Sequence, residues 1–241
     1  MIYLLYIIFG LAPSIIWLLF FLRKDVHPEP KKMILNVFFW GILITVPVLL
    51  IEMLVASNLK KLNLPSALTS LLYWFIGVAF VEEFFKYLVV RSKVLNNPEF
   101  DEPVDAMLYM IIAALGFAAI ENIFYLIPNG PPLPFFKIIS QTITTSSIRF
   151  LGAVFLHALC SGVVGYFLAL SFFKPKKHNR LIILGLAIAT LLHGLFNFSI
   201  MKIEQSYYLI LIPIVILISL VFFVSFGFKK LKNIASICRL K

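Results

Sequence analysis

The sequence predicts an all-α, polytopic membrane protein, a bundle of about seven transmembrane helices, and three observations carry this prediction. Hydrophobic residues make up 61% of the 241 residues and charged residues 13%, whereas a soluble domain has about 25% charged residues. The mean hydropathy is +1.01. Long apolar runs recur along the chain, separated by short polar or proline-rich connections. This composition excludes a water-soluble globule, and we expect a single integral-membrane domain over residues 1–241.

Seven segments are long and apolar enough to cross a bilayer, which requires about 17–25 mainly apolar residues in a helix. They are residues 2–22, 33–56, 67–90, 104–127, 148–173, 181–201 and 207–228. The first has neither a basic leader nor a small-residue cleavage site, so we interpret it as a retained span and not as a signal peptide. Residues 135–147 are polar and follow a Pro/Gly-rich turn. They predict an interfacial or re-entrant helix that leads into the fifth span.

The distribution of lysine and arginine predicts the orientation of the bundle. Loops 23–32, 91–103 and 174–180 and the tail after residue 228 hold about fifteen basic residues, and the alternate loops hold about five. These five are Lys60, Lys61, Lys137, Arg149 and Lys202. Because basic loops stay in the cytoplasm, we expect a cell-membrane protein with its N-terminus outside and its C-terminus cytoplasmic. The net charge of +10 then reflects these loops and anionic lipid headgroups, and no nucleic-acid partner is expected.

Polar residues inside four consecutive predicted spans form the candidate site. They are Glu82, Glu83 and Lys86 on the third span, Glu121 and Asn122 on the fourth, His157 and Ser161 on the fifth, and His193 and Asn197 on the sixth. Ionisable groups at membrane depth are costly, face the bundle interior or a water-filled cavity, and mark functional sites. Spacings of three or four residues place side chains on one helix face. Lys86 is therefore expected to neutralise one neighbouring glutamate and leave the other free for chemistry.

Carboxylates, two histidines and an amide around a wet pocket are compatible with two chemistries. In the first, a glutamate deprotonates a water molecule that attacks a peptide carbonyl, a histidine assists proton transfer, and a His/Asn pair stabilises the oxyanion. In the second, a divalent metal ion activates the water. Its ligands would be Glu82, Glu121, His157 and His193. The sequence contains no H-E-x-x-H motif, which is the familiar sequence sign of such a site.

Other interpretations of these residues stay open at this point. The charged residues of the third span also fit a structural ion cluster, a non-enzymatic scaffold or a transporter, although a transporter favours inverted repeats and broken helices. Asn122 and Ser161 are typical of hydrogen bonds between packed helices. Cys160 lies close to His157 in sequence, but a small buried thiol is commoner than a nucleophile. With Cys238 as the second cysteine, neither a disulfide framework nor a zinc motif is indicated.

Five motifs in chain order resemble those of the PrsW family of intramembrane proteases, which is related to the CAAX prenyl endopeptidases and to bacteriocin-processing enzymes. HPEPKK follows the first span, EEFFK resembles EExxK, FAAIEN resembles FxxxEN, HALCS resembles an HAxxS-type motif, and HGLFNF resembles HGxFN/D. The resemblance runs from about residue 10 to residue 200. It implies a glutamate-type endopeptidase without a required cofactor, whose catalytic helices span about residues 67–201.

The resemblance also implies roles for individual residues. The matching positions are Glu82 and Glu83 for the paired glutamates, one of them the water-activating base, Glu121 for the second motif, His157 for the third and His193 for the fourth. Asn197 stands where relatives often carry Asp, and because Asn cannot ligate a metal as an anion, this departure favours an oxyanion role. Lys86, Asn122 and Ser161 are expected to support these groups. The implied partner is a membrane-anchored protein substrate, with an anti-sigma factor as the family expectation.

Overall fold

The computed structural model describes residues 2–25, 27–128, 130 and 134–234, and every regular element within them is helical. The α-helices are α1 (Ile2–Leu22), α2 (Lys31–Lys61), α3 (Ser66–Leu72), α4 (Val81–Lys93), α5 (Pro103–Leu126), α6 (Phe135–Leu151), α7 (Ala153–Phe172), α8 (His178–Met201) and α9 (Leu211–Leu231). Short connecting elements are η1 (Tyr73–Phe80), η2 (Pro175–Lys177), η3 (Ile203–Gln205) and η4 (Tyr207–Ile210). Within the described residues, seven helical stretches are long and apolar enough to cross a membrane. The predicted fold class is confirmed.

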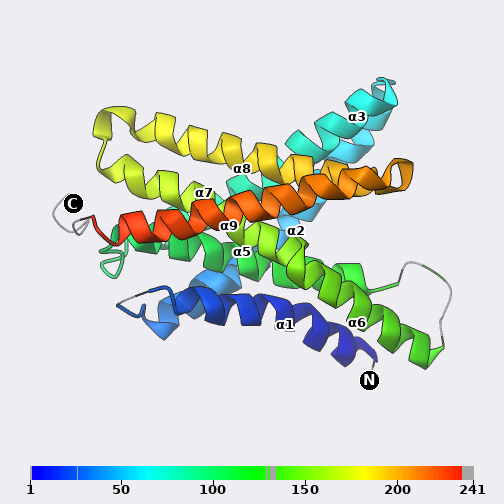
Figure 1. Ribbon diagram of the computed structural model, residues 1–241, viewed down its shortest axis with the longest axis horizontal. Coiled ribbons are helices and arrows are strands. Elements are labelled where there is room, and N and C mark those ends of the chain that lie inside the picture. The colour runs from blue at the N-terminus through cyan, green and yellow to red at the C-terminus, as the bar shows by residue number, and fades with distance from the viewer. Residues whose placement is uncertain (1, 26, 129, 131–133, 235–241) are drawn as a thin grey trace.

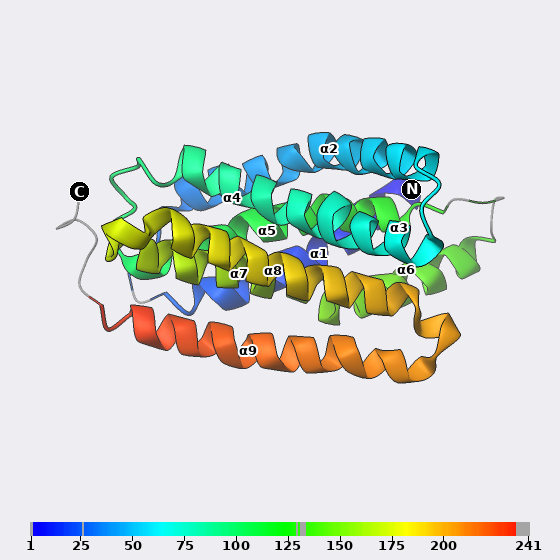
Figure 2. The ribbon, with the colours of Figure 1, turned by 90° about the horizontal axis from the view of Figure 1, so that it is seen from above.

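Helix α5 forms the centre of the bundle, and the other spans surround it (Figures 1 and 2). In its most apolar 18-residue window, 94% of the residues are buried, whereas the corresponding share in α1, α2 and α9 is below 30%. A helix that is apolar on all sides belongs in the interior. Glycines allow the close contacts: a side chain on Gly116 would collide with the backbone of α2 at Phe38, and one on Gly165 with the backbone of α5 at Ala106. The helices therefore approach one another closely at these two glycines.

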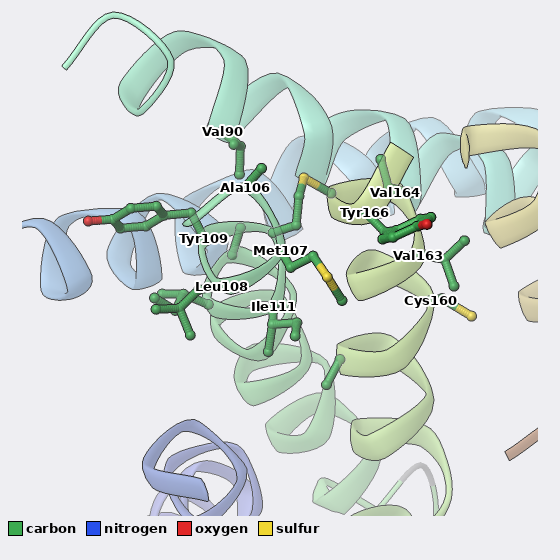
Figure 3. Packing of buried hydrophobic residues seen from close by; sticks show 14 of the residues in the cluster. Val90, Ala106, Met107, Leu108, Tyr109, Ile111, Cys160, Val163, Val164 and Tyr166 are labelled. Atoms are coloured by element: carbon green, nitrogen blue, oxygen red, sulfur yellow. The ribbon is translucent and has the colours of Figure 1, made fainter. Parts of the chain in front are cut away.

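Apolar side chains fill the contact between α5 and α7 (Figure 3). Met107 and Ile111 of α5 and Val163 and Val164 of α7 belong to the same buried cluster. Cys160 lies in this cluster and is fully buried, which confirms its interpretation as a small core residue. Cys238 lies outside the described residues. Because this core immobilises α7 against the central helix, the polar residues of α5 and α7 are held in fixed positions.

The third span is one continuous helical path made of α3, η1 and α4. Its middle part, η1, is π-helical, and π-helical turns shift the register of the following residues and often occur at functional sites. The paired glutamates Glu82 and Glu83 begin the next turn, directly after this segment. Helix α4 continues past residue 90, the predicted end of this span, and ends at Lys93.

The fifth span differs from its predicted boundaries. We expected residues 148–173 to form one span after an interfacial or re-entrant helix over 135–147. Instead α6 continues to Leu151 and α7 begins at Ala153, with the break at Gly152, whose backbone leaves the helical region (φ −100°, ψ −92°). The glycine has no side chain to hold the helical geometry, and the polar run before it is helical throughout. The break redirects the chain just before His157.

The basic connections lie together at one end of the bundle (Figure 1). The α1–α2, α4–α5 and α7–α8 connections and the C-terminal end of α9 share this end, and the N-terminal end of α1 lies at the opposite one. At the end with the basic connections, the Tyr109 hydroxyl of α5 donates a hydrogen bond to Glu29 of the α1–α2 loop. Partial burial raises the pKa of the Glu29 carboxyl, because desolvation disfavours its charged form. This contact fixes the first proline-rich loop to the central helix.

Candidate active site

Helices α4, α5, α7 and α8 bring the predicted polar residues into one buried cluster. Glu82, Glu83, Lys86, His157 and His193 are each no more than 3% exposed. Ser161 is also fully buried within this group, and Asn122 lies at its edge. Residues separated by more than 100 positions in the sequence therefore meet at one place inside the bundle.

The ammonium group of Lys86 is the centre of this cluster. Its Nζ lies 3.0 Å from Glu82 Oε2, 2.9 Å from Glu83 Oε1 and 2.9 Å from His157 Nδ1. A lysine ammonium has three hydrogens to donate and no acceptor, so these three contacts use its full capacity. Lys86 was expected to neutralise one of the two glutamates and leave the other free for chemistry. Its position one turn after both carboxylates lets it contact each of them, although its single positive charge balances only one.

Glu83 is enclosed, and both of its carboxylate oxygens are engaged. Oε1 accepts hydrogen bonds from Lys86 and from His193 Nδ1, the latter at 3.1 Å, and Oε2 accepts one from the Ser161 hydroxyl at 2.7 Å. Ser161 therefore donates to a carboxylate and is not paired with His157, although the two residues lie one turn apart. This arrangement gives no support to a serine nucleophile.

The contacts of His157 define its proton arrangement. Because Lys86 only donates, His157 Nδ1 accepts, and the ring proton resides on Nε2 in the neutral imidazole. His157 Nε2 then donates to Glu121 Oε2 at 2.7 Å. Glu121 also forms an ion pair with Arg149, whose Nη2 lies 2.9 Å from the same oxygen. A carboxylate that holds the second ring nitrogen fixes the orientation of the imidazole.

Arg149 is a site residue that sequence reasoning missed, because it was counted among the basic residues of the outer loops. It lies in the last turn of α6 and is mostly buried. Its Nε donates to Asn122 Oδ1 at 2.5 Å, and Asn122 Nδ2 donates to the carbonyl of Gly10 in α1 at 3.3 Å. Asn122 thus links helices, as expected. Arg149 compensates the charge of Glu121 and does not contribute a free basic charge to a loop.

A cavity of about 210 Å³ opens beside the cluster. Its polar and aromatic lining residues are Glu52, Tyr73, Trp74, Glu82, Glu121, Phe124, Tyr125, Arg149, His157, Phe196 and Asn197. Glu82 reaches this cavity, whereas Glu83 does not contribute to its wall. His193 is also absent from the wall; its Nε2 lies behind Glu82, 4.0 Å from Oε2. Of the two α8 residues, Asn197 alone is positioned to contact a molecule in the cavity.

Glu52 is the second residue that sequence reasoning missed. It lies on α2 within the apolar run VLLIEMLVA, and its carboxylate lines the same cavity as Glu82 and Glu121. The signal was present in the sequence, because a single carboxylate inside an apolar span is costly and marks a functional site. It had no polar neighbour at helical spacing, which is the pattern by which the other candidates were recognised.

The fold and this cluster define a multi-pass membrane protein whose helices enclose a buried group of carboxylates, histidines and a lysine. A family model described as PrsW family intramembrane metalloprotease matches residues 29–226, and the chain belongs to this family. It is therefore an intramembrane protease.

Similar proteins carry the name Protease PrsW. That of Oceanobacillus iheyensis is 33% identical over 213 residues, covering 87% of this chain and 88% of the relative. Those of Geobacillus kaustophilus and Bacillus subtilis are each 31% identical, covering 83% and 95% of this chain and 82% and 94% of the relatives. No solved structure matches this chain significantly.

The family description includes a metal, and four side chains of the cluster could in principle supply its ligands. Glu82, Glu83, His157 and His193 each offer one ligand atom, and these atoms lie within 4.8 Å of one another. Oxygen and imidazole donors are suitable for zinc. The Lys86 ammonium, however, lies within 3.0 Å of three of these side chains, where a metal ion would otherwise be placed. With Lys86 in this position, these side chains do not fit a metal ion.

Proposed function

We propose that this protein cleaves a peptide bond of a membrane-anchored protein by means of a water molecule activated by Glu82. The observation that carries the proposal is the unequal environment of the paired glutamates. Glu82 reaches the cavity, whereas both oxygens of Glu83 are used by Lys86, His193 and Ser161. A general base must reach the proton that it removes, and of these two carboxylates Glu82 meets this requirement.

In the proposed reaction, Glu82 removes a proton from water as the water oxygen bonds to the carbonyl carbon of the substrate. The negative charge that develops on the carbonyl oxygen is stabilised by the side-chain amide of Asn197 in the cavity wall, as in other oxyanion sites. The C–N bond then breaks, and the proton passes from Glu82 to the leaving nitrogen. His157 lies beside Glu82, with its Nδ1 3.5 Å from Oε2. Because its Nδ1 accepts from Lys86 and its Nε2 donates to Glu121, we assign it to positioning, which differs from the proton-transfer role expected from the sequence.

The remaining residues position these groups. Lys86 contacts both carboxylates of the pair, and its single positive charge compensates one of them in apolar surroundings, where an unpaired ion would be strongly unfavourable. Glu83 holds Lys86 and His193, and Glu121 holds His157. We assign His193 to positioning, because it contacts Glu83 and does not line the cavity. This differs from the oxyanion role expected for it from the sequence.

The proposed cleavage of a membrane-anchored substrate can be tested in the cell. We expect membranes from a strain with Glu82→Gln to accumulate one full-length, single-span protein that is truncated in the wild type, an anti-sigma factor being the class suggested by the family resemblance. Quantitative membrane proteomics of the two strains measures this difference. A strain with Glu99→Gln, a substitution of an exposed glutamate, is the matched control. Identical membrane protein profiles in the wild type and the Glu82→Gln strain would contradict the proposed function.

The orientation is part of the same proposal. The basic connections lie at one end of the bundle, and basic loops are retained in the cytoplasm. We expect tags in the loops 23–32 and 174–180 to be protected in intact cells, and a tag in the connection 128–136 to be labelled from outside. Impermeant thiol labelling of single-cysteine variants measures this. The opposite labelling pattern would place the site nearer to the cytoplasmic face and refute the orientation.

A further inference from the structure

Glu52 is a buried carboxylate that the proposed mechanism does not use. It is 8% exposed, and its Oε1 has no hydrogen-bond partner among the residues that the structure describes. Glu82 and Glu83 each pair with Lys86, and Glu121 pairs with Arg149. Within the described part of the chain, no ion pair involves Glu52. Its environment is therefore unlike that of the other three site carboxylates.

An unpartnered buried carboxylate requires an explanation, because a native structure normally satisfies its buried polar groups. A charge at membrane depth is unfavourable unless it serves a function. Glu52 lies on α2, outside the four helices that carry the catalytic cluster, and it lines the cavity that Glu82 reaches. The missing partner is therefore expected in the space that the substrate enters.

The chemistry of the wall indicates which partner fits. Three carboxylates and one guanidinium line the cavity, so its wall carries an excess of negative charge that attracts a cation. Tyr73 and Trp74 line the same space as Glu52, and the faces of such rings favour cations. One example is present: the Arg149 guanidinium lies 3.9 Å from the ring centre of Tyr125. A carboxylate beside aromatic rings is chemically suited to bind a basic side chain.

We propose that Glu52 determines substrate specificity by binding a lysine or arginine side chain of the segment that enters the cavity. This inference rests on the proposed function, because the basic residue must lie near the peptide bond presented to Glu82. Cation binding at Glu52 satisfies its free oxygen and removes the unpaired charge. Substrates without a basic residue in this position leave Glu52 unsatisfied and are cleaved less efficiently.

Cleavage specificity is the first test. Full-length wild-type, Glu52→Gln and Glu82→Gln proteins are incubated with bacterial membranes, and the new N-termini are sequenced. For each cleaved sequence, two single-span reporter peptides are compared, one with lysine near the cleavage site and one with norleucine at the same position. We expect Glu52→Gln to reduce the lysine preference in kcat/KM by about thirtyfold or more, mainly through KM. An unchanged preference, or wild-type sites without nearby basic residues, would overturn the inference.

Binding of a small cation gives a second measurement that does not depend on cleavage. The probe is n-butylguanidinium, with n-butylurea as its uncharged counterpart. We expect the cation to raise the Tm of the wild type and of Glu82→Gln but not that of Glu52→Gln, and the urea to raise none of them. Equal Tm shifts in the wild type and Glu52→Gln would refute the cation site. If Glu82→Gln cleaves substrates like the wild type while this binding pattern holds, the proposed function is refuted. Cation binding at Glu52 would then still stand.

Thermal stability without ligand separates this role from a structural one. Removing a buried charge that has no partner is neutral or stabilising, so Glu52→Gln is expected to unfold at the same temperature as the wild type or above it. Glu52→Met, with an apolar side chain of similar length, provides a second variant. A marked fall in Tm for both, with equal loss of all substrates, would show that Glu52 is structural.

Discussion

Replacing Glu82 by Gln lowers kcat by about 10²–10⁴-fold, the usual contribution of a general base, and leaves the fold intact. Gln has the size of Glu and still accepts a hydrogen bond from Lys86, but it cannot take a proton from water. Because Glu82 has few contacts beyond Lys86, the Tm of the Glu82→Gln variant is expected to differ little from that of the wild type. Single-turnover cleavage of a mapped substrate by the purified protein measures the rate. Glu99→Gln, at an exposed position, is the control.

Glu83→Gln also loses activity, but for a different reason. Glu83 is fully buried and holds Lys86, His193 and Ser161. Either substitution leaves Lys86 beside one carboxylate, but a glutamine at position 83 has one acceptor oxygen instead of two for these three donors. A buried donor left without a partner costs about 1–3 kcal/mol, so this variant is expected to unfold at a lower temperature than Glu82→Gln. The assignment is wrong if Glu82→Gln turns over at nearly the wild-type rate. It is reversed if Glu83→Gln is inactive at unchanged Tm while Glu82→Gln remains active.

The helices of this protein follow from local sequence properties, and its site follows from them only in part. Apolar runs of sufficient length identify the seven spans, and four-residue spacing places Glu82 and Lys86 on one face, where they meet at 3.0 Å. Such contacts lie within one helix, so periodicity is enough to predict them. His157 contacts Lys86, and His193 contacts Glu83. That both histidines meet this cluster was inferred from their occurrence on consecutive spans.

The parts that could not be predicted depend on packing between distant helices. The Arg149–Asn122 contact joins α6 to α5 only because the chain breaks at Gly152 and α6 lies beside α5. Spacing places His193 and Asn197 on one face of α8, but one helical turn separates them along the axis by about 6 Å. This difference in depth brings Asn197 to the cavity and leaves His193 behind Glu82. No local pattern contains that information.

Asn197 gives the second large expected effect, and it separates the two ways of activating water. If Asn197 donates a hydrogen bond to the oxyanion, Asn197→Ala lowers kcat by about 10²–10³-fold, the typical loss for one such donor, with KM nearly unchanged. Asn197→Asp is not expected to restore activity, because a second negative charge repels the developing oxyanion. Asn58→Ala removes an exposed amide on α2 and serves as the control. Initial rates over a range of substrate concentrations distinguish kcat from KM.

A metal-dependent reaction would respond in the opposite way to the same substitution. Aspartate is a better ligand for a divalent cation than asparagine, so Asn197→Asp would then retain or increase activity, and chelators would abolish it. With the Lys86 ammonium within 3.0 Å of Glu82, Glu83 and His157, a divalent ion among these side chains must displace or repel that charge. We therefore expect purified, active protein to contain far less than one metal ion per chain and to resist chelation. Stoichiometric metal together with full activity of Asn197→Asp would refute the metal-free mechanism.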